Sequence, residues 1–238
     1  MKAIILTAVE YKEKDGILTC LSEGKCFSVT VKGMFDPKSK FAYLNYPMLV
    51  VDLELNDDGR YKYPVLKNCS ITFNPNKVKP EYEDLVGISF LSEATKKLLQ
   101  DEEKATVYPI LLNAIYALKN RDDLWQTLLI YLANCMKIAG FEFEVNRCVF
   151  CGSKIDIARF SFADGGFVCR NCLDEGTELA DLNHEQLMLL RDSFIVTTFD
   201  IVLKNCTRDN ALAILNCLRS YIIDQIGVDM TSIGLLNR

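Results

Sequence analysis

The stretch Cys148-Val-Phe-Cys151, followed by Cys169-Arg-Asn-Cys172, decides the fold of the second half of this chain. Residues 152–168, 17 positions, separate the two Cys-x-x-Cys pairs, and this spacing is typical of four-cysteine zinc sites. Each pair turns back on itself so that two thiolates converge, and two pairs supply the four sulfurs of a tetrahedron. We therefore predict one structural Zn²⁺ ion held by Cys148, Cys151, Cys169 and Cys172.

Two alternatives stay open for these cysteines. A redox-active dithiol pair also uses the Cys-x-x-Cys pattern, and the metal site could be degenerate or empty. A catalytic zinc site fits this pattern least well, because such sites keep an open coordination position that four thiolates would close. The only histidine, His184, lies twelve residues beyond Cys172 and has no local ligand partner. We predict no catalytic residues.

The residues around the cysteines predict a hairpin. Gly152 follows the first pair, where a tight turn favours positive φ. Gly165-Gly166 separates two strand-like pieces, 159–162 and 167–169, so we expect its turn to return the second pair to the first. Four thiolates carry more negative charge than the metal neutralises. The cations expected to compensate are Arg147, Lys154 and Arg170.

The composition is that of a folded protein. The chain has 238 residues, of which 50% are hydrophobic and 25% charged, enough for one large or two small domains. It contains no apolar run of eighteen residues, so we expect no transmembrane helix. The first ten residues predict a strand and not a signal peptide. Ten cysteines without a secretion signal indicate a reducing compartment. The six cysteines outside the two pairs are expected to be small buried hydrophobes: Cys20, Cys26, Cys69, Cys135, Cys206 and Cys217.

Charge is distributed unevenly along the chain. Residues 1–80 hold twelve Lys and Arg against nine Asp and Glu, and residues 81–238 hold fifteen against twenty-three. The net charge of −5 is therefore +3 in the first part and −8 in the second. Such asymmetry can mark a nucleic-acid-binding face on the basic part.

The first part predicts a small β-barrel. Short runs rich in Val, Ile, Leu and aromatic residues are separated by Gly- and Asp-containing turns. Five strands in about seventy-five residues suit a closed barrel of the OB type. The predicted strands are 3–9, 17–21, 25–31, 47–55 and 61–73.

The second part predicts helices. A segment from Pro75 to Pro80 forms the expected boundary. Beyond it, apolar residues recur with helical period over 82–100, 105–119 and 122–139, with Gly140 just after the last. Asn183 with Gln186 predicts the start of another helix, and Thr207 and Gly227 bound the last long one. We predict an α+β protein with an OB-type barrel at 1–80 and a helical domain at 81–238, which carries a zinc-ribbon-like insert at about 145–175.

A basic loop in the barrel is the candidate DNA-binding site. It holds cations for phosphates and rings for base stacking, and the candidate residues are Lys32, Phe35, Lys38, Ser39, Lys40 and Phe41. The alternative is an ordinary solvated loop whose phenylalanines pack into the barrel. The charged segment 11–14 is expected to be only a turn. Arg208 and Arg219 are the next candidates for DNA contacts.

The order of these features resembles the bacterial RecO family of DNA repair proteins along the whole chain. The most specific match is the lead-in Gly140-Phe-Glu-Phe to Cys148-Val-Phe-Cys151-Gly152, followed by an aromatic strand, Gly165-Gly166 and Cys169-Arg-Asn-Cys172. The segments 16–19 and 38–40 carry a weaker match in the first part.

The resemblance implies a recombination mediator that is not an enzyme. Members of that family bind single- and double-stranded DNA and anneal complementary strands. They act with RecR and single-strand-binding protein to load RecA, in the bacterial cytoplasm at the nucleoid and without a membrane. The competing hypothesis is a redox-responsive or zinc-stabilised interaction adaptor without real DNA binding.

Overall fold

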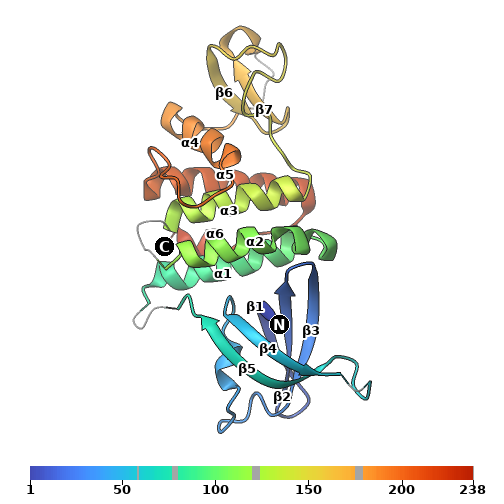
Figure 1. Cartoon of the computed structure of the whole chain (residues 1–238). Helices are drawn as coiled ribbons and strands as arrows, with labels where there is room; N and C mark the ends of the chain where they lie inside the picture. The colour runs from blue at the N-terminus through green and yellow to red at the C-terminus, as the bar shows by residue number, and fades with distance from the viewer. Residues whose placement is uncertain (58, 77–79, 120–123, 175–178, 238) are drawn as a thin grey trace.

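The computed structural model describes residues 1–57, 59–76, 80–119, 124–174 and 179–237. The molecule is elongated, with a β-barrel at one end, a layer of helices in the middle and a small two-stranded insert at the other end (Figure 1). Its architecture is α+β, as the sequence predicted. Among the helices of the described residues, none combines the length and the apolar character that a membrane span requires.

Five strands close the barrel in the order β1-β2-β3-β5-β4. Neighbouring strands pair antiparallel, except that β3 and β5 run parallel and meet at Thr30 and Val65. Alternating side chains of these strands fill the barrel interior, among them Ile5, Leu18 and Val29. The strands are β1 (Lys2–Tyr11), β2 (Asp15–Ser22), β3 (Lys25–Val31), β4 (Val50–Asn56) and β5 (Val65–Phe73).

Two predicted strands begin later than expected. β4 starts at Val50 and not at residue 47, because Met48 takes a φ of 64° that breaks extended backbone. A short 3-10 helix, η1 (Ala42–Asn45), occupies the chain just before it. β5 starts at Val65, directly after Pro64, because proline has no N–H to give to the ladder.

The first helices follow the predicted pattern, with one shifted start. α1 (Tyr82–Leu98), α2 (Asp101–Ala117) and α3 (Leu124–Ile138) form the middle layer. α2 begins four residues before the predicted 105, because Gln100 and Glu103 form a capping box. Residues 122 and 123 of the predicted third helix lie outside the described residues, as do 77–79 of the expected boundary.

The start of α4 and both ends of α5 lie where the sequence predicted them, whereas the sequence did not predict α6. α4 (His184–Ile195) is capped by Asn183, whose side chain accepts a hydrogen bond from the Gln186 backbone N–H. α5 (Arg208–Ile226) starts after the N-cap Thr207 and stops at Gly227, whose φ is 68°. A short helix, α6 (Thr231–Leu236), packs against α1.

The outer face of the barrel packs against the helices in one hydrophobic cluster, which is separate from the cluster inside the barrel. Outward-facing barrel residues such as Ile4, Leu6 and Val50 belong to the same buried cluster as Phe90 of α1. A buried hydrogen bond from the Ser92 hydroxyl to the Leu6 carbonyl, 3.0 Å long, also joins them. The helices therefore cover one side of the barrel and leave its far end free (Figure 1).

Candidate metal centre and nucleic-acid interface

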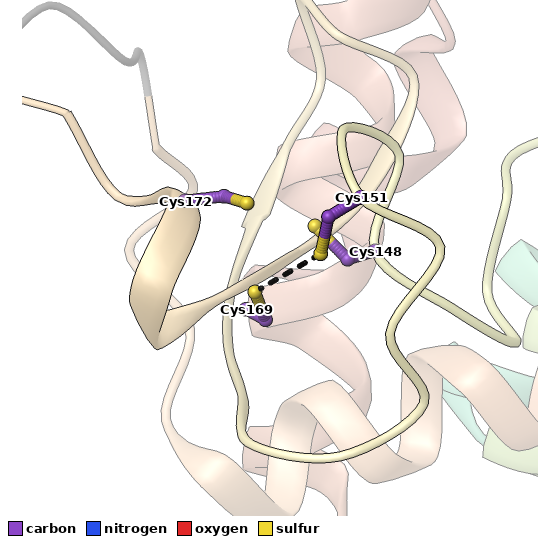
Figure 2. Close-up of side chains that lie close together, drawn as sticks. All are labelled: Cys148, Cys151, Cys169 and Cys172. Carbon is purple, nitrogen blue, oxygen red and sulfur yellow. Dashed lines mark hydrogen bonds between the residues drawn. The ribbon is translucent and has the colours of Figure 1, made fainter.

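The four predicted cysteines lie together in the insert (Figure 2). The insert contains β6 (Ile157–Ser161), β7 (Gly166–Cys169) and the 3-10 turn η3 (Arg170–Cys172). Cys148 and Cys151 belong to a turn before β6, Cys169 ends β7, and Cys172 ends η3. The hairpin thus brings the second pair back to the first, as predicted.

The sulfur geometry fits a tetrahedral metal ion. All four Sγ atoms lie within 4.8 Å of one another, and Cys151 Sγ and Cys169 Sγ are 3.6 Å apart. Four metal–sulfur bonds of about 2.3 Å require sulfur–sulfur edges of about 3.8 Å. A disulfide would need about 2.05 Å, and all four cysteines are free thiols. Four thiolates complete the coordination shell, which is the arrangement of a structural site.

Backbone hydrogen bonds shape the first cysteine turn. Gly152 has a φ of 72° and donates its N–H to the Cys148 carbonyl at 2.9 Å. Burial tends to raise the pKa of Cys148, but backbone N–H donors from Cys169, Cys151 and Phe150 lower it to about 6. Hydrogen bonds with Cys151 and Cys169 raise the pKa of Cys172 to about 12. A metal ion would displace the protons that the remaining thiols keep.

The turn between β6 and β7 uses one glycine and not the predicted pair. Gly165 takes a φ of 75° in the turn, whereas Gly166 is the first residue of β7. Gly166 pairs with Glu144 in an isolated parallel bridge. A Cβ atom on Gly166 would lie 2.4 Å from the Glu144 carbonyl oxygen. Gly166 therefore allows a close backbone approach, which anchors the insert to the segment before the cysteines.

The three predicted cations have different surroundings. Arg147 forms an ion pair with Glu144 at 2.9 Å. Lys154 and Arg170 are exposed, and neither has an ion-pair partner among the residues that the structure describes. Their part in balancing the thiolate charge stays a prediction.

The predicted DNA loop is partly neutralised by carboxylates from the β1–β2 turn and from the loop itself. Lys32 Nζ lies 2.8 Å from Asp15, and Lys14 Nζ lies 2.8 Å from Asp36. The hydrogen bond and charge of Lys14 hold the pKa of Asp36 below its ordinary value. Lys38 and Lys40 are exposed and remain the loop cations best placed for a ligand.

The aromatic residues of the loop do not offer open faces for stacking. Phe41 is only 7% exposed, and Phe35 packs half-buried against the barrel core. The Ser39 hydroxyl accepts a hydrogen bond from the Phe41 backbone N–H at 3.1 Å, which closes the turn. Both rings therefore match the alternative in which the phenylalanines of the loop pack into the barrel. The assignment of Ser39 to DNA binding stays a prediction.

Another set of aromatic residues is exposed beside the lysines. Lys32 Nζ lies 4.5 Å from the centroid of the Tyr61 ring, Tyr61 is 45% exposed, and Tyr11 is 44% exposed. Lys12 lies over the Tyr11 ring and Lys62 over the Tyr63 ring. The signal for this surface was the repeated Tyr-Lys pair at 11–12 and 61–62, which the sequence placed in a turn and at the start of a strand.

Tyr11, Lys12, Tyr61 and Lys62 lie in or beside two loops that bind ligands in OB barrels, and Lys32 directly follows β3. The loops between strands 1 and 2 and between strands 4 and 5 line the oligonucleotide-binding face of that fold. In this barrel they lie at the end that points away from the helices (Figure 1). We call the set Tyr11, Lys12, Lys32, Tyr61 and Lys62 the barrel-end surface.

The two alternative arginines are occupied within the protein. Arg219 makes a two-pronged contact with Asp229, at 2.6 and 2.9 Å. Arg208 pairs with Glu83 at 3.1 Å and packs over the Trp125 ring. Arg208 joins α5 to α1, and Arg219 joins α5 to the segment that follows it, so both side chains make structural contacts.

The structure thus defines a class: a barrel-containing α+β protein with a four-cysteine metal centre in its helical region. The family described as "Recombination protein O C terminal" matches residues 80–232, more than half of the chain. The chain belongs to this RecO family.

Individual relatives agree with that assignment. "DNA repair protein RecO" of Bifidobacterium animalis subsp. lactis is 31% identical over 175 residues, covering 71% of this chain and 72% of the relative. The protein of the same name from Mycoplasma capricolum is 23% identical over 247 residues, covering 100% and 96%. The latter alignment includes the barrel, which the family match does not.

Proposed function

We propose that this chain is a DNA-binding recombination mediator in DNA repair. It binds single- and double-stranded DNA, anneals complementary strands, and helps RecR load RecA onto strands coated with single-strand-binding protein. It acts as a mediator and not as an enzyme, in the bacterial cytoplasm at the nucleoid. Membership of the RecO family supports this role, and the barrel-end surface is the observation that carries it.

The barrel-end surface has the chemistry of a single-strand site. Exposed tyrosines give sequence-tolerant stacking faces for bases, and lysines beside them attract the phosphate backbone. Lys38 and Lys40 extend the cations along the neighbouring loop. Lys32 joins the two tyrosine-bearing loops to this surface, because it follows β3 directly and its Nζ lies 4.5 Å from the centroid of the Tyr61 ring.

The metal centre holds one Zn²⁺ in this proposal and has a structural role. Four thiolates favour zinc over the hard cations that prefer oxygen ligands. The free energy of metal binding then contributes directly to the folding of the insert, because the unfolded segment has no preformed site. Metal analysis of protein purified without chelator tests this, with one zinc per chain expected. Metal-free native protein with two disulfides would contradict the zinc assignment and favour a redox role.

The two parts of the chain have different roles in this proposal. We propose the barrel, residues 1–80, as the DNA-binding domain, and residues 81–238, with the insert at about 145–175, as the part that contacts proteins. The charges of +3 and −8 on the two parts support this, because an acidic surface repels phosphates.

The experiment is a titration of a fluorescent oligonucleotide at several salt concentrations. Replacing Lys12 and Lys62 with alanine should weaken binding and flatten the salt slope by about 0.7 for each single-strand phosphate that the variant no longer neutralises. Tyr61→Phe, which keeps the ring, should bind like the parent, whereas Tyr61→Ala should lose about 1 kcal/mol or more of stacking. Lys204→Ala, an exposed lysine outside the barrel, is the matched control. Equal binding by all variants would favour the adaptor hypothesis.

A further inference from the structure

A pocket lies between the insert and α4, remote from the barrel-end surface. Its volume is about 550 Å³, within the range of small-ligand sites. Its floor is apolar, formed by Val145, Phe167 and Leu187, each less than 5% exposed. α4 contributes one face at positions 184, 187, 188 and 191, which are neighbours on a helix surface.

The rim of the pocket carries two cations, Lys154 and Arg191. His184 stands beside them and offers a ring N–H that can donate a hydrogen bond. Arg191 contacts Asp192 at 3.2 Å, and Lys154 has no ion-pair partner in the part of the chain that the structure describes. An apolar floor below converging cations suits a ligand with a flat apolar body and an anionic group.

Asp156 adds a second kind of group to this rim. Its φ of 56° lies in the left-handed region, which aspartate adopts more readily than most residues other than glycine. The Arg170 backbone N–H donates to the Asp156 carbonyl at 2.8 Å, which holds the residue in place from the second cysteine turn. Asp156 and Asn146 both line the pocket, so residues that carry side-chain acceptors for N–H donors border the same space as the cations.

We propose that this pocket binds a phosphorylated nucleotide. The base lies against the apolar floor, the phosphate meets Lys154, His184 and Arg191, and Asn146 and Asp156 hydrogen-bond to the base edge. Two sources offer this chemistry: a free nucleotide, and the 5′-phosphorylated terminal nucleotide of a DNA strand. An acidic peptide would satisfy the cations but would bring its carboxylates against Asp156, whereas a base presents N–H donors to it.

The site goes beyond the function proposed above and does not depend on it. The insert and the barrel occupy opposite ends of the molecule (Figure 1). Variants of the pocket therefore leave the barrel-end surface intact. An experiment can contradict the pocket proposal without contradicting the proposed DNA-binding function, and the reverse also holds.

The test measures binding of deoxynucleoside 5′-monophosphates by calorimetry, and of short oligonucleotides with a 5′-phosphate or a 5′-hydroxyl by fluorescence anisotropy. Lys154→Ala and Arg191→Ala should each weaken phosphate-dependent binding by about tenfold, the value of one charge-assisted hydrogen bond. Arg159→Ala, an exposed cation of the same insert that does not line the pocket, is the control and should bind like the parent. Asp156→Asn should weaken the binding of deoxyguanosine monophosphate most, because guanine presents adjacent N–H donors that suit a carboxylate.

The outcomes separate the possibilities. Binding of free monophosphates assigns the free nucleotide, and binding only of 5′-phosphorylated strands assigns the strand end. Lys154 is exposed, so its variant stays informative if Arg191→Ala does not fold. The proposal is overturned if the parent binds neither probe, if Lys154→Ala binds like the parent, or if an acidic peptide binds in a Lys154-dependent way while nucleotides do not.

Discussion

Glu93 on α1 accepts hydrogen bonds from both the backbone N–H and the hydroxyl of Ser232 at the start of α6. Thr231 donates to the same carboxylate from its N–H at 3.1 Å and its hydroxyl at 2.8 Å, and Lys97 pairs with it at 2.7 Å. α6 has no side-chain cap of its own. Glu93 therefore serves as the cap of a helix that lies 138 residues away in sequence.

This contact should make stability depend on pH. Burial tends to raise the pKa of Glu93, but the hydrogen bonds from Lys97 and Ser232 lower it to about 2, from 4.5. The stabilisation is thus fully present above pH 4.5 and is lost as the pH falls towards 2. Glu93→Gln should lose about 2 kcal/mol of unfolding free energy at neutral pH, with a smaller loss under acidic conditions near the lowered pKa. Urea denaturation at the two pH values measures both; an equal loss at each would show that charge is not the cause.

Gly166 should be required for the insert, and Gly165 much less so. Gly166→Ala places a methyl group 2.4 Å from the Glu144 carbonyl, so it should destabilise the insert by about 3 kcal/mol and speed the release of bound metal to a chelator. Gly165→Ala is the matched control, because its added Cβ meets nothing within 4 Å. It costs only the strain of a φ of 75°, about 1 kcal/mol. Metal release at the parent rate from Gly166→Ala would contradict the close-approach argument.

Removing a carboxylate from the basic loop should strengthen DNA binding. Asp36 pairs with Lys14 and also accepts a hydrogen bond from the Lys38 backbone N–H. Asp36→Asn keeps an acceptor for that N–H but frees Lys14, so the salt slope should steepen by about 0.7 if Lys14 then meets a single-strand phosphate. Glu142→Gln, in the helical region, is the control. Unchanged binding and an unchanged salt slope for Asp36→Asn would show that the loop does not face DNA.

Local sequence signals predicted the cysteine cluster, the start of α4 and both ends of α5. Cysteine spacing located the four ligands because two short turns and one hairpin are enough to assemble them. Thr207, Gly227 and the pair Asn183–Gln186 act within one helical turn, so their effect is visible in the sequence.

Features that depend on distant partners were not predictable in this way. Asp15 neutralises Lys32, and Asp36 pairs with Lys14, only because the barrel brings two loops together. The burial of Phe41 depends on barrel closure, which a single residue pair, Thr30 and Val65, completes. The loop at residues 32–41 therefore carries less unpaired positive charge, and exposes less aromatic surface, than its sequence suggested.

Strand annealing by this chain should depend on a partner. Annealing requires that two phosphate backbones be neutralised at once while the base edges stay free to pair. The barrel-end surface supplies cations for one strand, and the residues after 80 carry a net charge of −8, which does not favour a second strand. We therefore expect this chain alone to anneal strands coated with single-strand-binding protein slowly, and to gain rate when RecR adds charge or a second copy of the surface. Annealing of complementary labelled oligonucleotides, with and without RecR, measures this, and RecR alone is the control. If the chain alone anneals coated strands at full rate and RecR changes nothing, then both strands bind within one chain, and the acidic region does not face away from DNA.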